Sequence, residues 1–280
     1  MERPSTVLVT GASSGIGRAI ALRFARDGAA LIVHYASDAE GAQETAMAAL
    51  ALGAASATTL CGVLGGSSNE NGAASAALAT AAVAAAGGRL DVAILNAGAF
   101  TLADAVGPDA VSYATFCSAW HKTLALNLEA PAQLGFLLGR HMAGGAFSGQ
   151  EAPPAPPTAP PAAVGAIVVV GSRGALRGEP SAWGYAASKA GLHALSQSMA
   201  LSLGRYGVVV AAVAPGFVAT PMAAPRLAGP DGPGIAAQSP WGRVATPEEV
   251  AETVAFAAGY RRCPWLSGAV IDVNGASYVH

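Results

Sequence analysis

The chain has little charge, few aromatic side chains and almost no cysteine. Charged residues make up 11% of its 280 residues and aromatic ones 6%, and the formal net charge is −2. Such a chain lacks the strongly basic surface with which proteins bind nucleic acids or anionic membranes. Because hydrophobic types supply 52% of the residues, a wholly disordered chain is excluded as well.

Long hydrophobic runs are missing too. No stretch reaches the roughly 18 uninterrupted apolar residues of a membrane span, and residues 1–4 lead into a short apolar run without the basic region of a secretory signal. The three cysteines are widely spaced, and the five histidines show no ligand spacing. We therefore expect no disulfide framework, no metal site and no membrane partner, and a cytoplasmic location.

What the chain does have is an alternation of short apolar runs with longer alanine-rich stretches. The runs are continuous, which is typical of strands buried on both faces of a parallel sheet. They cover residues 6–10, 31–35, 92–96, 167–171, 208–213 and 270–273, with a weaker run at 57–63. Stretches of helical length lie between them, at 16–27, 39–52, 73–86, 116–142, 185–206 and 247–260. This order predicts an α/β fold: a single doubly wound Rossmann domain over residues 1–280, with a parallel sheet of about seven strands and helices on both faces.

Two segments depart from this rhythm. Residues 143–164 hold six prolines among alanine and glycine, which predicts a solvated loop insertion of polyproline-like character; a contact arm for a partner is the alternative. Residues 221–242 are rich in glycine and proline and follow a strand whose carboxyl end should border the ligand site. We expect them to form a mobile segment that covers the substrate.

A glycine-rich turn joins the first strand to the first helix. It reads Thr10-Gly11-Ala12-Ser13-Ser14-Gly15-Ile16-Gly17. Gly11 permits a tight turn, Gly15 removes a Cβ where a pyrophosphate would approach, and Gly17 allows the helix to pack closely on the strand. The first helical N–H groups would then face the phosphates. The strand before and the helix after the turn favour a dinucleotide site over a purely structural turn.

The G-x3-G-x-G spacing of this turn resembles that of the short-chain dehydrogenase/reductase family, and further motifs extend the resemblance over essentially the whole chain. They are Leu95-Asn96-Ala97-Gly98, Asn127, Ser172, Tyr185-Ala186-Ala187-Ser188-Lys189, Pro215-Gly216 and the stretch 268–275. In character the chain is nearest to the 3-oxoacyl-carrier-protein reductases. The resemblance implies a nicotinamide cofactor, hydride transfer between a carbonyl and an alcohol, and a homo-oligomer, either a tetramer or a dimer.

The resemblance also implies which residues contact the cofactor. Besides Tyr185 and Lys189, they are Gly11, Ser13, Ser14, Gly15, Ile16, Gly17, Arg18, Tyr35, Ser37, Asn96, Ala97, Gly98, Pro215, Gly216, Val218 and Thr220. The backbone near Val218 is expected to meet the nicotinamide carboxamide, and Thr220 to lie near the pyrophosphate. Asn96 is expected to order the backbone beside the adenosine ribose, with a purely structural role as the alternative.

NADP(H) is the expected cofactor, with NAD(H) as the alternative. An acid at the end of the second strand would bind the adenosine ribose and repel a 2′-phosphate, but Tyr35-Ala36-Ser37 stand there, and Asp38 follows as a candidate helix cap. Ser37 and Arg18 could each contact a 2′-phosphate. The family's usual acid near the end of the third strand is replaced by Gly62, so a side-chain hydrogen bond beside the adenine is lost, although a backbone N–H could serve instead.

Tyr185 and Lys189 are the predicted catalytic pair. They stand four residues apart in a predicted helix and so share one face. A free tyrosine, whose pKa is about 10, is a poor acid–base catalyst near neutral pH, but a neighbouring ammonium favours the phenolate and lowers that pKa. Tyr185 could then donate a proton to the alkoxide formed when a carbonyl is reduced, or remove one in the reverse direction.

The resemblance adds two residues to this pair and a second task for the lysine. Ser172, thirteen residues before Tyr185, matches the family's serine that polarises the substrate carbonyl, where a hydroxyl stabilises developing negative charge. Asn127 matches the helix asparagine that holds a water and completes a proton relay to the lysine. Lys189 would also bind the hydroxyls of the nicotinamide ribose.

The expected substrate is a small ketone or aldehyde, neutral or moderately apolar. Residues 221–242 should supply an apolar wall with little charge, from Met222, Leu227, Ile235 and Trp241. One alternative is a 3-oxoacyl-carrier-protein reductase, which the absence of lysine and arginine from the Pro-rich insertion weakens. A second is an NADP-binding regulatory protein without turnover, although such proteins usually lose the tyrosine or the lysine. Enoyl reduction would want a longer spacing between these two residues.

Overall fold

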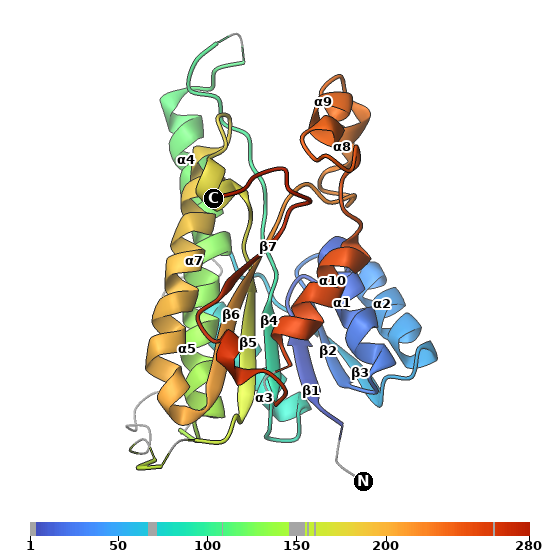
Figure 1. Cartoon of the computed structure of the whole chain (residues 1–280), viewed down its shortest axis with the longest axis vertical. Helices are drawn as coiled ribbons and strands as arrows, with labels where there is room; N and C mark the ends of the chain where they lie inside the picture. Colours follow the sequence, from blue (N-terminus) through green and yellow to red (C-terminus); the bar gives the residue numbers. More distant parts are fainter. Residues whose placement is uncertain are drawn as a thin grey trace.

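The computed structural model describes residues 4–66, 72–107, 109–145, 155, 157–159, 161–259 and 261–280. At its centre is a seven-stranded parallel sheet in the order β3-β2-β1-β4-β5-β6-β7 (Figure 1). The strands are β1 (Thr6–Val9), β2 (Ala30–Tyr35), β3 (Ser56–Cys61), β4 (Val92–Leu95), β5 (Gly165–Val170), β6 (Val208–Pro215) and β7 (Val270–Val273). The predicted fold class and the parallel sheet of about seven strands are confirmed.

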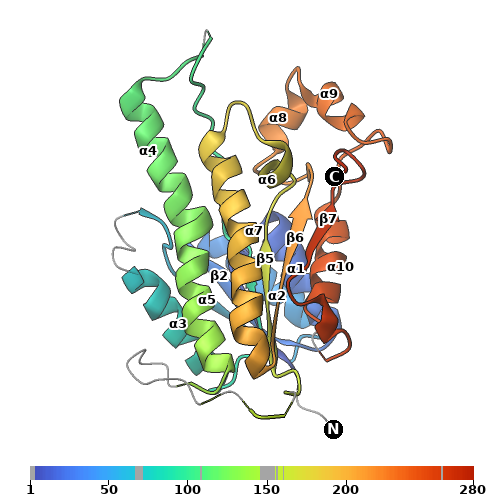
Figure 2. The same cartoon turned by 60° about the vertical axis from the view of Figure 1, so that its left-hand side comes forward.

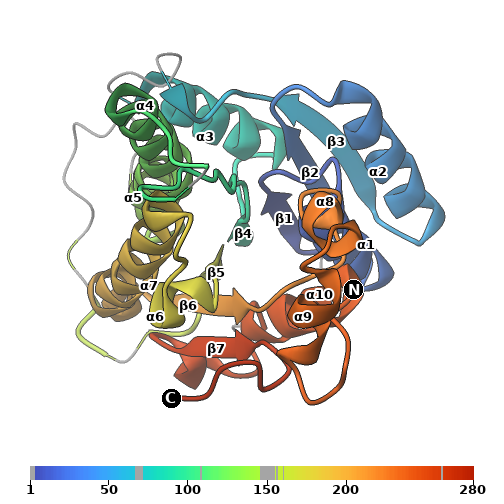
Figure 3. The same cartoon turned by 90° about the horizontal axis from the view of Figure 1, so that it is seen from above.

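Helices cover both faces of this sheet, which explains why its strands are apolar without alternation. On one face lie α1 (Gly15–Arg26), α2 (Ala39–Ala51) and α10 (Pro247–Ala257); on the other lie α3 (Ala73–Ala85), α4 (Tyr113–Leu124), α5 (Ala130–Met142) and α7 (Trp183–Leu203) (Figures 1 and 3). Val7 and Val9 of β1 belong to the core cluster on the α1 side, whereas Leu8 belongs to the cluster on the α5 side. The strand β3 lies at the sheet edge, and its mix of exposed and half-buried residues explains its weak signal in the sequence.

The helix predicted over residues 116–142 is a longer rod with a local change of winding. It starts at Tyr113, where the Ser112 side chain accepts a hydrogen bond from the Thr115 N–H. A π-helical turn, η2 (Ala125–Glu129), joins α4 to α5, and Figure 2 shows the rod running beside α7. Asn127 lies within this π-turn. Such turns are frequent at functional sites, but apolar periodicity over so few residues cannot reveal one.

The two segments that break the rhythm of the sequence have different outcomes. Half of residues 143–164 lie outside the described part of the chain, so the loop character of this insertion stays a prediction. Residues 221–242 contain two short helices that the sequence did not suggest, α8 (Ala224–Ala228) and α9 (Gly232–Ala237), and both stand over the carboxyl edge of the sheet (Figure 1). A third short helix, α6 (Gly174–Arg177), follows β5. Within the described ranges, no helix is long and apolar enough to cross a membrane.

The strand order creates a crevice between β1 and β4. From β1 the chain continues to β2 on one side, whereas β4 leads to β5 on the other, so the connections diverge at this point. In open parallel sheets, ligands bind at the carboxyl ends of the strands where the order reverses. The two strands remain joined at that end, because the Thr10 N–H donates to Ile94 O over 3.0 Å.

The N-terminus of α10 provides a test of local stability. The Thr246 side chain accepts a hydrogen bond from the Glu249 N–H, and the Glu249 carboxylate accepts one from the Thr246 N–H. Thr246→Ala should therefore lower the free energy of unfolding by about 1 kcal/mol in urea denaturation. The matched control is Thr80→Ala, at an exposed site inside α3 where alanine has the higher helix propensity. Equal losses in the two variants would contradict the capping role.

Candidate active site

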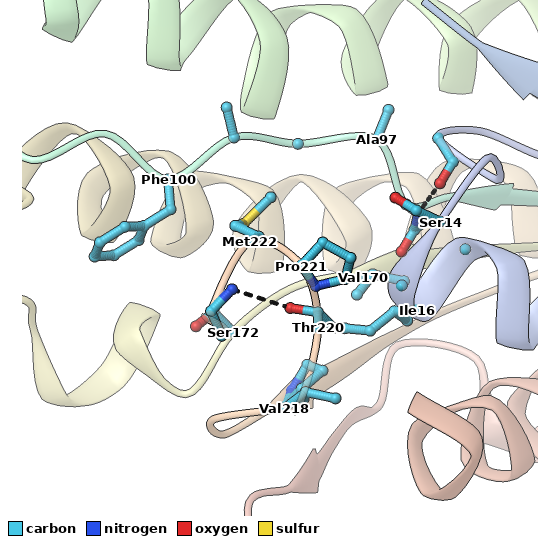
Figure 4. A pocket seen from close by; sticks show the side chains of 18 of the residues that line it. Ser14, Ile16, Ala97, Phe100, Val170, Ser172, Val218, Thr220, Pro221 and Met222 are labelled. Atoms are coloured by element: carbon cyan, nitrogen blue, oxygen red, sulfur yellow. Dashed lines mark hydrogen bonds between the residues drawn. The ribbon is translucent and has the colours of Figure 1, made fainter. Parts of the chain in front are cut away.

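A cavity of about 390 Å³ runs along the carboxyl edge of the sheet. Its lining comes from the glycine turn, from the segments that follow β2 to β6, and from α7. Figure 4 shows Ser14, Ile16 and Ala97 at one end of this space, and Ser172, Met222 and Phe100 at the other. Segments that are distant in the sequence therefore meet in one elongated cavity.

The glycine turn is packed too tightly for side chains. A Cβ on Gly17 would collide with the carbonyl oxygen of Gly11 and with the side-chain amide of Asn96. That amide donates to Thr10 O over 2.9 Å and to Gly11 O over 3.1 Å. The turn is thus fastened to the end of β4, and the first turn of α1 stands beside the cavity. This cradle of backbone amides, with Gly11 and Gly15 at positive φ, fits a bound pyrophosphate.

His34 holds the same turn from its other side. Its Nδ1 accepts a hydrogen bond from the Gly11 N–H over 3.1 Å, and its Nε2 lies 2.9 Å from Gly62 O. One ring can make both bonds only when Nδ1 is bare and Nε2 carries the proton, as in a neutral histidine. Burial lowers the pKa of His34 and so favours this neutral form. The sequence analysis missed this role, and the only signal was a polar residue inside an apolar strand.

The end of the cavity beyond β2 presents backbone and small polar groups. Tyr35 and Ser37 line it, while the Asp38 side chain caps α2 by accepting from the Gly41 N–H, as the helix-cap interpretation predicted. Gly62 lines the cavity, but its own N–H donates to Tyr35 O within the sheet. That N–H therefore cannot replace the missing acid.

Arg18 is engaged outside the cavity lining. Its guanidinium forms an ion pair with Glu44 on α2, with 3.0 Å between Nη1 and Oε2. It does not line the cavity. A contact between Arg18 and a phosphate would require this pair to open.

The segments after β4 and β6 face each other across the middle of the cavity. Ala97 and Gly98 lie on one side, and Pro215, Gly216, Val218 and Thr220 lie on the other. A Cβ on Gly15 would lie 3.3 Å from the Thr220 Cγ2, so the threonine closes over the glycine turn. Every residue predicted to contact the cofactor or to be catalytic lines the cavity except Arg18 and Asn127; the role of each stays a prediction.

Ser172, Tyr185 and Lys189 come together at the other end. The Ser172 hydroxyl lies near enough to the Tyr185 hydroxyl to lower the pKa of the tyrosine. The Lys189 side chain is buried, and its Nζ donates to Val170 O at the end of β5 over 2.8 Å. Ser172 follows two residues later, and its Oγ accepts from the Gly174 N–H over 3.0 Å. Two hydroxyls that converge in this way can hold a carbonyl oxygen and give it a proton.

The electrostatics of this group differ from the expectation that Lys189 lowers the tyrosine pKa. Burial raises the pKa of Tyr185 above its ordinary value, the nearby Ser172 hydroxyl opposes this, and Glu179 raises it further. Burial also lowers the pKa of Lys189 to about 8. Desolvation therefore dominates in the protein alone, and Tyr185 is a neutral phenol near pH 7.

Asn127 positions a loop in this structure. Its Oδ1 accepts from the Ala99 N–H over 2.8 Å, and its Nδ2 donates to Ala99 O over 2.9 Å. The segment after β4 is thereby held against the π-turn. A Cβ on Gly98 would lie 3.2 Å from the Asn127 Oδ1 and 3.6 Å from the Lys189 Nζ, so these groups are neighbours. The proton relay that the resemblance implies stays a prediction.

Several groups at this end were not foreseen. His193, one turn after Lys189, accepts from the Ser172 N–H over 3.4 Å and so helps to fix the serine.

The expected apolar wall also differs: Met222 lines the cavity, but Leu227, Ile235 and Trp241 do not. The additional lining residues with rings or charges are Phe100, Arg173, Glu179, Phe217 and Arg226. Within the described ranges, no three His, Cys, Asp or Glu side chains gather as metal ligands would.

Comparisons with known proteins agree with this arrangement. A family model described as "Enoyl-(Acyl carrier protein) reductase" matches residues 11–275. The chain is 35% identical over 268 residues to cis-4-hydroxycyclohexanecarboxylate dehydrogenase of Sinomonas cyclohexanicum, covering 96% of this chain and 94% of the relative. It is 32% identical over 271 residues to 3beta-hydroxysteroid dehydrogenase 1 of Eggerthella lenta, covering 96% of this chain and 92% of the relative. The solved structure of the angucycline C-6 ketoreductase LanV with bound NADP is similar, with a TM-score of 0.77 and 29% identity. The match covers 98% of this chain and 95% of LanV.

The close packing of the glycine turn predicts a selective effect on cofactor binding. Gly17→Ala should raise the Kd for NADPH at least about 10-fold, because the turn must move to admit a methyl group beside Gly11 O. The measurement is titration by the change in NADPH fluorescence. Gly204→Ala is the matched control, since an added Cβ there meets nothing within 4 Å. A Kd near that of the unmodified protein in Gly17→Ala would contradict the cradle.

The burial of His34 predicts that the free energy of unfolding depends on pH. Because its pKa is lowered in the folded state, the folded protein binds fewer protons than the unfolded chain, whose histidines titrate near pH 6.5. The stabilising effect is fully present above that pH and is lost as the pH falls through about 6.5 towards the lowered value. In urea denaturation, the free energy of unfolding of His34→Gln should depend less steeply on pH between 7.5 and 5.5. The slope should fall by up to about 1.4 kcal/mol per pH unit. The same change at exposed His121 should leave the slope as it is; equal slopes in all three proteins would argue against it.

Proposed function

The chain belongs to the short-chain dehydrogenase/reductase family, whose dehydrogenases and reductases act on hydroxyl or keto groups with a nicotinamide cofactor, and from this premise we propose that it interconverts a ketone or aldehyde and an alcohol with NADP(H). The observation that carries the proposal is the shared cavity. The glycine turn lines one end of it, and Ser172, Tyr185 and Lys189 line the other.

The proposed roles follow from the contacts of these three side chains. A bound nicotinamide would supply or accept the hydride. Ser172, whose Oγ is fixed by the Gly174 N–H, orients the substrate oxygen and stabilises its developing charge. Tyr185, whose hydroxyl is near that serine, transfers the proton. Lys189 is held at the end of β5 by Val170 O, where its ammonium is placed to bind ribose hydroxyls.

The protonation state of Tyr185 supports reduction as the favoured direction near neutral pH. Burial raises its pKa, so the phenol carries the proton that a reduced carbonyl needs. Alcohol oxidation requires the phenolate instead. The four-residue spacing of Tyr185 and Lys189 supports carbonyl rather than enoyl reduction, although the matching family model is described as an enoyl reductase.

The adenosine end of the cavity supports NADP(H) over NAD(H). Asp38 lines the cavity, but one of its carboxylate oxygens is engaged by the Gly41 N–H as the cap of α2. Ser37 is exposed there and can donate to a 2′-phosphate. Bound NADP in the similar LanV structure agrees with this assignment. The similar proteins are named for a hydroxycyclohexanecarboxylate, a hydroxysteroid and an angucycline, which makes cyclic ketones the first substrates to test.

The proposal includes a homo-oligomer in the cytoplasm. The outer face of α5 and α7 carries Phe136 and Leu201, whose exposed fractions are 57% and 81%. These helices lie side by side (Figure 2), and a second copy could cover both apolar side chains. Cys61, Cys117 and Cys263 are free thiols, as is usual in a reducing compartment.

Tyr185→Phe tests the enzymatic proposal. It removes the hydroxyl that transfers the proton while it keeps the ring that packs against Phe100. We expect a loss of at least about 100-fold in kcat for NADPH-dependent reduction across a panel of cyclic ketones, with the Kd for NADPH changed by less than about threefold. Repeating the assay with NADH measures the cofactor preference.

The control variant is Tyr113→Phe, because Tyr113 is 82% exposed on the surface of α4. It should retain the turnover of the unmodified protein. Full turnover in Tyr185→Phe would refute the assignment of the proton donor. Tight NADPH binding without turnover of any ketone by the unmodified protein would favour the regulatory alternative.

A further inference from the structure

Arg226 of α8 is a charged residue at the catalytic end of the cavity. Its guanidinium lies 5.4 Å from the ring centre of Phe100 and 5.1 Å from that of Phe217. Both rings line the cavity. Phe100 also packs edge-on against Tyr185, with 4.9 Å between ring centres, and Figure 4 shows Phe100 at the same end as Ser172. One aromatic ring therefore separates the guanidinium from the ring of the proposed proton donor.

Two aromatic contacts leave the hydrogen-bonding capacity of Arg226 unused. Among the described residues, its side chain makes no hydrogen bond and no ion pair. Other arginines of the chain are paired: Arg23 with Glu252, and Arg243 with Glu249. A guanidinium has five N–H donors in a planar fork that matches a carboxylate. The contacts with Phe100 and Phe217 restrict where the guanidinium lies and so reduce the ordering needed to bind a ligand.

The other charges at this end do not cancel Arg226. Glu179 is the one acidic side chain among the cavity-lining residues near Tyr185. Burial lowers the pKa of Arg173, and the charge of Glu179 opposes this shift. Arg173 is buried beside Ser172 and donates to Gln238 and Ser277. Glu179 is thus opposed by Arg173, whereas the described residues offer Arg226 no counter-charge. This balance adds a charged side chain to the apolar wall with little charge that the sequence predicts for residues 221–242.

We infer that Arg226 is a specificity-determining residue that binds an anionic group, foremost a carboxylate, on the ketone or alcohol substrate. The inference rests on the proposed oxidoreductase function and names its substrate class. The substrate is a keto acid or hydroxy acid whose reacting carbon lies at Ser172 and Tyr185 and whose carboxylate receives the Arg226 fork. The apolar body between the two groups packs on Phe100 and Phe217. Neutral ketones bind without this contact.

The test compares two ketones that differ in charge but little in size: 4-oxocyclohexanecarboxylate and 4-oxocyclohexanecarboxamide. The readout is the ratio of their kcat/KM values with NADPH. This ratio removes any effect of a substitution on the packing of α8, because such an effect lowers both rates together. The unmodified protein should favour the carboxylate, and Arg226→Gln should reduce the ratio by about 10- to 100-fold. Arg226→Lys keeps the charge without the planar fork and should retain an intermediate preference.

Arg177→Gln is the matched control. Arg177 lies on α6 near the same end, but it is exposed, bonds Gln238 and does not line the cavity. Its variant should keep the ratio of the unmodified protein. An unmodified protein that reduces both ketones equally, or an Arg226→Gln variant that keeps the preference for the carboxylate, would overturn the inference and leave the proposed function standing. If the unmodified protein reduces neither these ketones nor any neutral ketone, the proposed function itself fails.

Discussion

The fastening of the first strand to the fourth is the constraint on which the rest of the site depends. The Thr10 hydroxyl accepts hydrogen bonds from the Asn96 and Ala97 N–H groups, and the Asn96 side chain donates back to Thr10 O and Gly11 O. These bonds cross the crevice where the strand order reverses, so the turn that would receive phosphates cannot shift independently of β4. Since Gly17 leaves no room beside Gly11, the same contacts set where α1 begins. The position of the turn that would bind the cofactor therefore depends on the geometry of the sheet.

The catalytic end is fixed by a comparable link between α7 and β5. Lys189 gives up solvation to donate to Val170 O, and burial lowers its pKa to about 8. His193, one turn later, accepts from the Ser172 N–H, so one face of α7 reaches the strand end at two points. Burying an amine costs free energy. The buried contact also fixes the position of Tyr185, which precedes Lys189 on the same face of α7. This explains why Tyr185 and Lys189 can be close and yet not bonded to each other directly.

The elements with a strong pattern could be predicted from the sequence, and those defined by single contacts could not. Continuous apolar runs give β1, β4 and β6 within two residues, because strands buried on both faces have no polar side. The glycine turn and the Tyr185–Lys189 pair could be singled out because their spacings occur together with the other motifs of the family resemblance. The π-turn at Asn127 and the ion pair of Arg18 were not, since each depends on local winding or on a partner distant in the sequence. His34 was missed for the same reason: its two partners come from the ends of different strands.

A chain with so few rings and charges nevertheless gathers both at the proposed catalytic end of the cavity. Phe100 packs on Tyr185, Arg226 lies over Phe100 and Phe217, and the Arg173 guanidinium lies 5.4 Å from the ring centre of Phe217. This series joins the segments after β4, β5 and β6 to α7 and α8. Each cation–aromatic contact contributes about 0.5 to 2 kcal/mol, depending on its exposure, so α8 is held by contacts that also border the reacting groups. The substrate proposed above would contact the same rings and the same guanidinium that hold α8 at this end of the cavity.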